Sequence, residues 1–437
     1  MLHRTLATFL GAAALVAGSL LPARAVDVAA HESPGGIAFW LVEEPSIPIV
    51  SMEVTFRGGA RLDPADRPGL ARMMTTLLDE GAGERDAVAF AKARDELAVR
   101  FGAKADSDSI EVGVQMLAEE AEASAALVAE ALAVPRFDAE AVERIRAQFL
   151  SMLAEQESRP NDVASKAWLA RAFPDHPYGR PADGTIESVS AITREELAAA
   201  HRRLLTRANA LVAVVGAVDA ERAGRLVDIL LGALPEGEPV PAVAPTAPPP
   251  PGLEVVELPV PQSAAIFGHA GLPREDPDFY AAFVMNYILG GGGLSSRLME
   301  EVREKRGLAY GVYSYFSLRK GAPLYLGGVQ TANARMAESL DVIRAEWARM
   351  AAEGVTAEDL AAAKTYLTGS FPLRFDSNAK IARFLVFVQE HDLGIDYVNR
   401  RNALIEAVTL EDVNRVAARL LKPEALSVVV VGQPAGL

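Results

Sequence analysis

Two stretches of the chain repeat one pattern at a fixed distance, and this repeat limits the folds open to it. Residues 193–216 read TREELAAAHRRLLTRANALVAVVG and residues 409–432 read TLEDVNRVAARLLKPEALSVVVVG, an ungapped match at an offset of 216. In each copy, a Thr followed three residues later by Glu196 or Asp412 predicts a capped amphipathic helix. The apolar run that follows, ending at Gly, predicts a strand. The constant spacing favours a duplicated α+β domain over a chance likeness of two helix–strand units.

A proline-rich segment separates the two copies. Residues 235–252 read PEGEPVPAVAPTAPPPPG. Because proline fixes φ and removes backbone donors, we expect an extended linker without a core. The linker divides the chain into an N-terminal domain at 26–234 and a C-terminal domain at 253–437, each of ordinary domain size.

Alternating sequence predicts strands within these domains. Residues 50–56 alternate apolar side chains with Ser51, Glu53 and Thr55, and residues 110–116 alternate in the same way. A period of two predicts mainly antiparallel sheets with one buried face and one more polar face. Helices expected to pack on these sheets lie at 67–79, 86–100, 276–289 and 295–306.

The first 25 residues have the features of a signal peptide. A short basic start precedes a mostly apolar stretch at 5–22, and Ala23-Arg24-Ala25 fits the small-x-small pattern of a cleavage site. We expect cleavage after about Ala25 and a periplasmic mature chain without membrane attachment. The alternative is an uncleaved anchor, because the apolar stretch has about the length of a short membrane span.

Composition excludes several classes of site. The sequence has no cysteine, which excludes disulfides, thiolate metal sites and a cysteine nucleophile. Its formal net charge of −15 argues against nucleic acid as the main partner, since phosphate binding needs clustered Lys and Arg. The six histidines are scattered, and no two have the spacing of a helical zinc site.

The C-terminal domain holds the most unusual stretch. Four consecutive glycines, Gly290, Gly291, Gly292 and Gly293, favour a loop whose backbone meets an extended ligand; a plain flexible connector is the alternative. Further on, Arg303 would lie late in a helix and Tyr310 would begin a strand. An Arg donor fork and a phenol could converge on one carbonyl oxygen or oxyanion. The alternative is a basic helix C-terminus that complements its dipole, beside a Tyr on a sheet.

These pieces resemble a known family. Residues 290–314, GGGGLSSRLMEEVREKRGLAYGVYS, resemble the C-terminal domain signature of the pitrilysin/insulinase zinc peptidases, which include the subunits of mitochondrial processing peptidase. Residues 56–61, 67–71 and 176–179 resemble parts of their N-terminal domain, so the likeness covers nearly the whole mature chain. The resemblance implies two homologous α+β domains that form half of a clam shell.

The chain departs from this family at the zinc motif. Active members carry H-x-x-E-H after Gly-Leu-Ala; the two His and a distal Glu bind zinc, and the motif Glu activates water. Here residues 69–71, Gly-Leu-Ala, are followed by Arg72, with Thr75 and Thr76 at the next motif positions, and the distal position falls near Met152. The departure implies that this chain binds no metal and has no peptidase activity alone.

Some members of the family work as two different chains, one with the zinc motif and one that supplies the Arg/Tyr pair. The resemblance therefore implies a non-catalytic, substrate-binding subunit of a periplasmic heterodimeric zinc metallopeptidase that degrades or processes unfolded peptides. Zinc would belong to the partner, Arg303 and Tyr310 would hold the substrate carbonyl or oxyanion, and the glycines would contact the peptide. The alternative is a peptide-binding or scaffold pseudoenzyme that acts without a catalytic partner. A zinc-free hydrolase has no visible nucleophile–base set.

Overall fold

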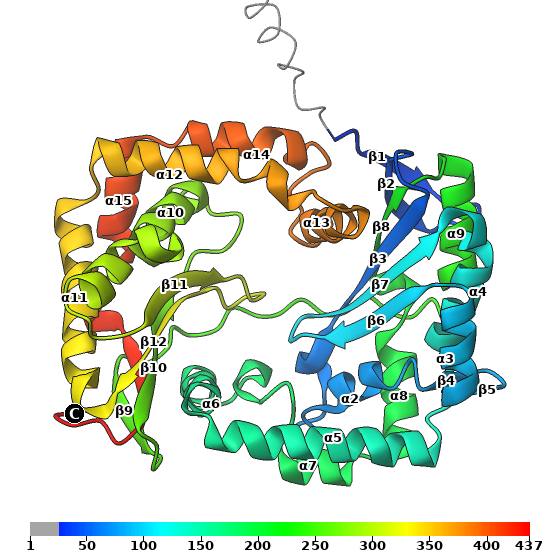
Figure 1. The fold of residues 1–437 in the computed structure, drawn as a ribbon, viewed down its shortest axis with the longest axis horizontal. Helices are drawn as coiled ribbons and strands as arrows, with labels where there is room; N and C mark the ends of the chain where they lie inside the picture. The colour runs from blue at the N-terminus through cyan, green and yellow to red at the C-terminus, as the bar shows by residue number, and fades with distance from the viewer. Residues whose placement is uncertain (1–25) are drawn as a thin grey trace, which may run out of the picture.

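The chain forms two β-sheets, each covered by helices (Figure 1). The computed structural model describes residues 26–437, and the predicted signal peptide at 1–25 lies outside them. The first sheet has the order β1-β2-β8-β3-β7-β6. Its strands are β1 (Ala29–Glu32), β2 (Ala38–Glu43), β3 (Ile49–Arg57), β6 (Arg100–Ala105), β7 (Ser109–Leu117) and β8 (Ala210–Gly216). A separate small hairpin pairs β4 (Gly81–Ala82) with β5 (Arg85–Asp86).

The second sheet repeats the topology of the first. Its order, β11-β12-β10-β13-β9, corresponds to β6-β7-β3-β8-β2. Each sheet has one parallel pair, β2 with β8 or β9 with β13, and its other pairs are antiparallel. The strands are β9 (Gly252–Glu257), β10 (Gln262–Ala270), β11 (Gly311–Ser317), β12 (Leu324–Ala332) and β13 (Ser427–Gly432). The predicted α+β fold of two homologous, mainly antiparallel domains is confirmed.

Helices flank both sheets, and the repeated helix is capped in the same way in each domain. The Thr193 hydroxyl accepts from the Glu196 N–H at 3.2 Å, and the Thr409 hydroxyl accepts from the Asp412 N–H at 3.1 Å. Both capping boxes are complete, as predicted. The first domain's helices are α2 (Leu70–Thr76), α3 (Ala87–Glu96), α4 (Ala121–Ala133), α5 (Ala139–Ser158), α6 (Pro160–Ala172), α7 (Ile186–Ala191), α8 (Arg194–Leu204) and α9 (Ala220–Leu231). Those of the second are α10 (Phe279–Asn286), α11 (Met336–Glu353), α12 (Ala357–Gly369), α13 (Asn378–Glu390), α14 (Tyr397–Glu406) and α15 (Leu410–Leu420).

One helix from each half packs against the sheet of the other half. Helix α6 lies on β10 and β13, where Trp168 is 1% exposed and its Nε1 donates to the Ser427 carbonyl at 2.9 Å. Helix α13 lies on β3 and β8, and Leu385 packs there with Val215. Figure 1 shows α6 beside the second sheet and α13 beside the first. The two domains are therefore joined by a reciprocal exchange of helices.

This exchange buries the polar face predicted for β3. Ser51, Glu53 and Thr55 do alternate with apolar residues, but they are only 1%, 3% and 3% exposed. The reason is that α13 covers them, and α13 lies more than 320 residues further along the sequence. Both faces of β3 are therefore buried.

The proline-rich linker is extended but fixed to both halves. Residues 235–251 have no regular secondary structure. The Asn209 side chain donates to the Glu238 carbonyl and accepts from the Val240 N–H, both at 2.8 Å. Further on, the Thr246 N–H donates to the Gly321 carbonyl at 3.0 Å. Among residues 26–437, no helix is long and apolar enough to cross a bilayer.

Candidate functional site

The positions that would form a zinc motif lie on helix α2, and their polar atoms are already engaged. Arg72 Nη1 lies 2.7 Å from Asp183 Oδ1, and Gln156 Nε2 of α5 donates to Asp183 Oδ2 at 3.1 Å. The hydroxyls of Thr75 and Thr76 both donate to the Arg72 carbonyl at 2.9 Å. The α2 segment is therefore held by an ion pair and by its own backbone.

These side chains do not suit a zinc ion. Structural and catalytic zinc sites use imidazole, thiolate or carboxylate ligands. Arg72 would place a positive charge beside a dication, and Met152, on α5, packs partly buried against the apolar core. Within residues 26–437, no three His, Cys, Asp or Glu side chains are grouped so that they could hold a metal ion.

The glycine stretch is not one continuous loop. Gly290 and Gly291 belong to the π-helical end of α10, η5 (Tyr287–Gly291), while Gly292 turns the chain into the short 3₁₀ helix η6 (Gly293–Ser295). A Cβ at Gly290 would lie 2.4 Å from Ser314 Oγ. This glycine therefore permits close packing of the helix end on β11, and the prediction of a loop is wrong for the first two glycines. Gly291 and Gly293 are exposed, and ligand contact by the stretch stays a prediction.

Arg303 and Tyr310 lie next to each other, as the sequence suggested. Arg303 lies on η7 (Met299–Glu304), a π-helix, and its Cζ lies 4.8 Å from the centroid of the Tyr310 ring. Gly307, at φ +60°, ends the helix as predicted, and Tyr310 directly precedes β11. Tyr310 is 86% exposed, and no hydrogen bond or ion pair engages the Arg303 guanidinium within residues 26–437. Both side chains therefore keep donors for a ligand.

The pair lines a cavity of about 890 Å³ that spans both halves of the molecule. Asn161, from α6 of the first half, donates to Gln330 Oε1 at 2.7 Å, and Gln330 Nε2 donates to Gln262 Oε1 at 3.2 Å. No carboxylate is among the described residues that line this cavity. The amides were missed at the sequence level because they belong to no motif and lie on three separate elements.

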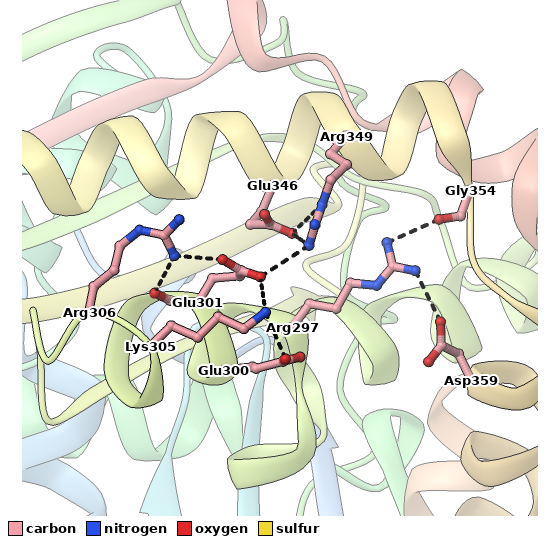
Figure 2. Close-up of polar contacts among 9 residues, drawn as sticks. All are labelled: Arg297, Glu300, Glu301, Lys305, Arg306, Glu346, Arg349, Gly354 and Asp359. Carbon is pink, nitrogen blue, oxygen red and sulfur yellow. Dashed lines mark hydrogen bonds and ion pairs between the residues drawn. The ribbon is translucent and has the colours of Figure 1, made fainter.

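A buried carboxylate holds the π-helix that carries Arg303 (Figure 2). Glu301 is 5% exposed and accepts from Lys305 at 2.7 Å, from Arg306 at 2.6 Å and from Arg349 of α11 at 3.5 Å. Hydrogen bonds from Lys305 and Arg306 lower the pKa of Glu301 to about 2, so it is ionised at neutral pH. This network ties the helix to α11 and positions Arg303.

A second contact fixes the start of the same segment. Arg297 donates to the Gly354 carbonyl and to Asp359 Oδ2, each at 3.0 Å, as Figure 2 shows. Gly354 and Asp359 flank the beginning of α12. The helix between the glycine stretch and Tyr310 is therefore anchored at both ends.

Comparison with known proteins agrees with the resemblance in sequence. Residues 39–186 match the family model described as Insulinase (Peptidase family M16), and residues 191–367 match the one described as Peptidase M16 inactive domain. An uncharacterized zinc protease of Mycobacterium leprae is 31% identical over 412 residues, which cover 91% of this chain and 90% of that protein. The chain belongs to the M16 peptidase family. The predicted pitrilysin/insulinase membership is therefore confirmed.

Two further relatives narrow the position within family M16. A non-peptidase homolog of Helicobacter pylori, YmxG, is 27% identical and covers 76% of this chain and 77% of that protein. A crystal structure of a peptidase M16 inactive domain from Pseudomonas fluorescens superimposes with a TM-score of 0.88 at 29% identity and covers 94% of this chain and 98% of that one. With the zinc ligands replaced in its own sequence, these likenesses support a non-catalytic M16 member.

Proposed function

We propose that this M16 protein is the non-catalytic, substrate-binding subunit of a heterodimeric zinc metallopeptidase. One observation carries the proposal: the polar side chains at the zinc-motif positions are paired within the protein, and those of the Arg303 site keep donors for a ligand. On α2 the Arg72 guanidinium is ion-paired and both threonine hydroxyls donate to the backbone, whereas Arg303 and Tyr310 present unengaged donors to a cavity. Zinc and the general base would come from a partner chain of the same family.

Arg303 and Tyr310 would act on the substrate carbonyl. A guanidinium and a phenol that both donate to one oxygen stabilise the negative charge that develops there when water attacks a peptide bond. The cation–π contact at 4.8 Å holds the two donors at one wall of the cavity. The anchored π-helix would reduce the reorganisation needed when the substrate binds.

The sheet edges beside the site support unfolded peptides as substrates. Strands β6 and β11 are edge strands of their sheets, and an edge strand offers unpaired N–H and C=O groups to which a peptide can add as a further strand. Strand β11 begins directly after Tyr310, so a peptide paired with it would pass the Arg/Tyr pair. The amide side chains of the cavity offer both donors and acceptors to a peptide backbone.

The signal sequence predicted at 1–25 supports export, which would place the chain and its zinc-bearing partner in the periplasm.

A scaffold pseudoenzyme without a catalytic partner is the second candidate. It is favoured by the likeness to a non-peptidase homolog.

Co-purification separates these two functions. The native protein should co-purify with a second M16 chain that bears H-x-x-E-H, and the mixture should cleave an unfolded peptide that this chain alone leaves intact. Peptide binding without such a partner, in native extracts and after mixing with zinc-bearing M16 chains from the same organism, would favour the scaffold function. One tight zinc per chain in the purified protein would contradict both.

A further inference from the structure

A second cavity, of about 790 Å³, shares no lining residue with the Arg303 cavity. It lies between the hairpin that joins β11 to β12, the end of α13, helix α14 and the proline-rich linker. Three of its lining cations, Arg274, Arg319 and Lys320, have no carboxylate within 4.0 Å among the described residues. The lining carboxylates, Glu275 and Asp392, are exposed. The cavity wall is thus more positive than the acidic chain as a whole.

Arg274 is held by aromatic rings and not by an acid. Its Nη2 donates to the hydroxyls of Tyr280 and Tyr397 at 2.8 and 2.9 Å, and its Cζ lies 4.2 Å from the centroid of the Phe279 ring. These contacts fix the guanidinium without neutralising its charge. The cation is therefore in place before any ligand arrives.

Lys320 and His391 face the same space. Lys320 Nζ donates to the Glu390 carbonyl at 2.7 Å, which leaves two of its three donors unengaged. His391 Nδ1 lies 3.0 Å from the Phe387 carbonyl and donates to it, so Nε2 carries the lone pair. No partner engages this Nε2 within residues 26–437.

Arg274, Lys320 and His391 line one cavity, and both cations act on the imidazole. Burial is the main cause that lowers the pKa of His391 to about 4; the charges of Lys320 and Arg274 act in the same direction, while the hydrogen bond to the Phe387 carbonyl and the charge of Asp392 oppose it. Lys320 comes from the hairpin, Arg274 from the segment before α10, and Asp392 directly follows the ring. Glu275, Arg319 and Arg400 line the same cavity, and the charge of Lys320 also acts on the carboxyl of Glu390, next to His391. An anion beside the ring would favour its protonated form, in which Nε2 is a further donor.

We propose that this cavity binds a small phosphate-type anion, held by Arg274, Lys320 and the Nε2 of a protonated His391. A phosphate group accepts hydrogen bonds from several directions, which matches donors that come from three separate elements. The same hairpin also meets the first domain, where Arg319 donates to Ser107 Oγ at 2.9 Å. A bound anion would thus lie where the two domains and the linker meet.

Titration of the purified full-length protein with inorganic pyrophosphate, at constant ionic strength, tests the site. The imidazole resonance of His391, followed by NMR, should shift in a saturable way, and the pKa of His391 should rise by one unit or more. His31 on β1, which does not line the cavity, serves as the internal reference. A His391 titration curve unchanged by millimolar pyrophosphate would overturn the proposal.

A pair of lysine variants provides the matched comparison. Lys320→Gln should weaken pyrophosphate binding roughly tenfold, because a charge-assisted hydrogen bond is lost. Lys364→Gln should leave it unchanged, since Lys364 Nζ also donates to a backbone carbonyl, that of Glu406 at 2.6 Å, but outside the cavity. Equal affinities in wild type and both variants would contradict the assignment. If Lys320→Gln does not fold, the wild-type titration decides alone.

Discussion

The two domains have the same fold, yet their candidate sites differ in whether the polar side chains are paired within the protein. In the first, Arg72 is ion-paired at 2.7 Å and the threonine hydroxyls donate to their own helix; in the second, Arg303 stacks on an exposed Tyr310 and makes no hydrogen bond or ion pair with residues 26–437. Sheet order and capping boxes are the same in both. The duplicated framework therefore depends on packing and capping, while the site side chains change independently of it.

The interfaces made by the exchanged helices α6 and α13 also differ, in the side chain that each helix covers at one corresponding position. Glu53 on β3 lies opposite Ala213, three residues before Gly216, and Ile266 on β10 lies opposite Val429, three residues before Gly432. The two positions correspond, but α13 covers a carboxylate paired with Arg383 at 3.5 Å, whereas α6 covers an aliphatic side chain. At this position one interface therefore holds a buried carboxyl group and the other an aliphatic side chain.

The largest effect should come from removing the large buried side chain of α6 at its interface with the second sheet. Trp168→Ala deletes a side chain that is 1% exposed, which should lower the free energy of unfolding by about 3–5 kcal/mol. Leu385→Ala on α13 should cost about 2–5 kcal/mol. Denaturant titration measures both, with Ser165→Ala on the exposed side of α6 as the control at under about 0.5 kcal/mol. A Trp168→Ala loss below about 1 kcal/mol would show that the exchange contributes little to stability.

The two arginines test the difference between the sites directly. In a mixture with the zinc-bearing subunit, Arg303→Ala should lower kcat by roughly ten- to a thousand-fold, the range for losing a donor to the oxyanion. Arg72→Ala should change kcat by less than about threefold, because its partner is Asp183 within the same chain. Tyr310→Phe should resemble Arg303→Ala in direction. The contrast would be lost if Arg72→Ala were as damaging as Arg303→Ala.

The buried carboxylate predicts a pH dependence confined to one interface. Burial raises the pKa of Glu53 from an unfolded value of 4.5 to about 7, against the opposing effect of Arg383. The folded state thus binds the Glu53 proton more tightly than the unfolded state does. The stability contribution is complete below about pH 4.5 and is lost as the pH rises through about 7.

Glu53→Gln should remove that loss, so the variant should gain stability relative to wild type between pH 5 and pH 8, by at most about 3 kcal/mol. Unfolding free energies of both proteins across this range measure the gain, and Glu43→Gln, at an exposed position on β2, is the control. If the difference between Glu53→Gln and wild type did not vary with pH, Glu53 would not titrate near neutral pH.

The smallest effects should be equal in the two domains. Thr193→Ala and Thr409→Ala each remove the hydroxyl of a complete capping box and should each cost about 1 kcal/mol. Denaturant titrations of the two variants should agree within about 0.5 kcal/mol. A much larger cost in one domain would show that the repeated helices have different roles.

Features with a local cause were predictable from the sequence. The capping boxes at Thr193 and Thr409 depend on residues three positions apart, and the C-terminal glycine of the Arg303 helix depends on φ at Gly307 alone. The closeness of Arg303 to Tyr310 followed from their separation of seven residues and from the family resemblance. Short-range sequence information is sufficient for such features.

Features that depend on residues far apart in the sequence could not be predicted. The burial of Glu53 depends on α13 from the other domain, and the packing of Gly290 depends on Ser314 of β11. The π-helical turns around the glycines have no signature in the residue pattern, since a π turn forms where tertiary contacts favour it. The cavity amides Asn161 and Gln330 come together only through the exchange of α6.

The reciprocal packing of α6 and α13 determines what proteolysis of the chain can achieve. A cut within the proline-rich segment would leave two fragments that remain associated through α6 and α13. The cleaved protein should therefore migrate in size-exclusion chromatography like the uncut protein until it is denatured. Either fragment made alone would expose the apolar sheet surface that the helix of the other fragment covers. It would also expose its own exchanged helix, with Trp168 in the N-terminal fragment or Leu385 in the C-terminal one. Such pieces should precipitate when synthesised separately and regain solubility when made together.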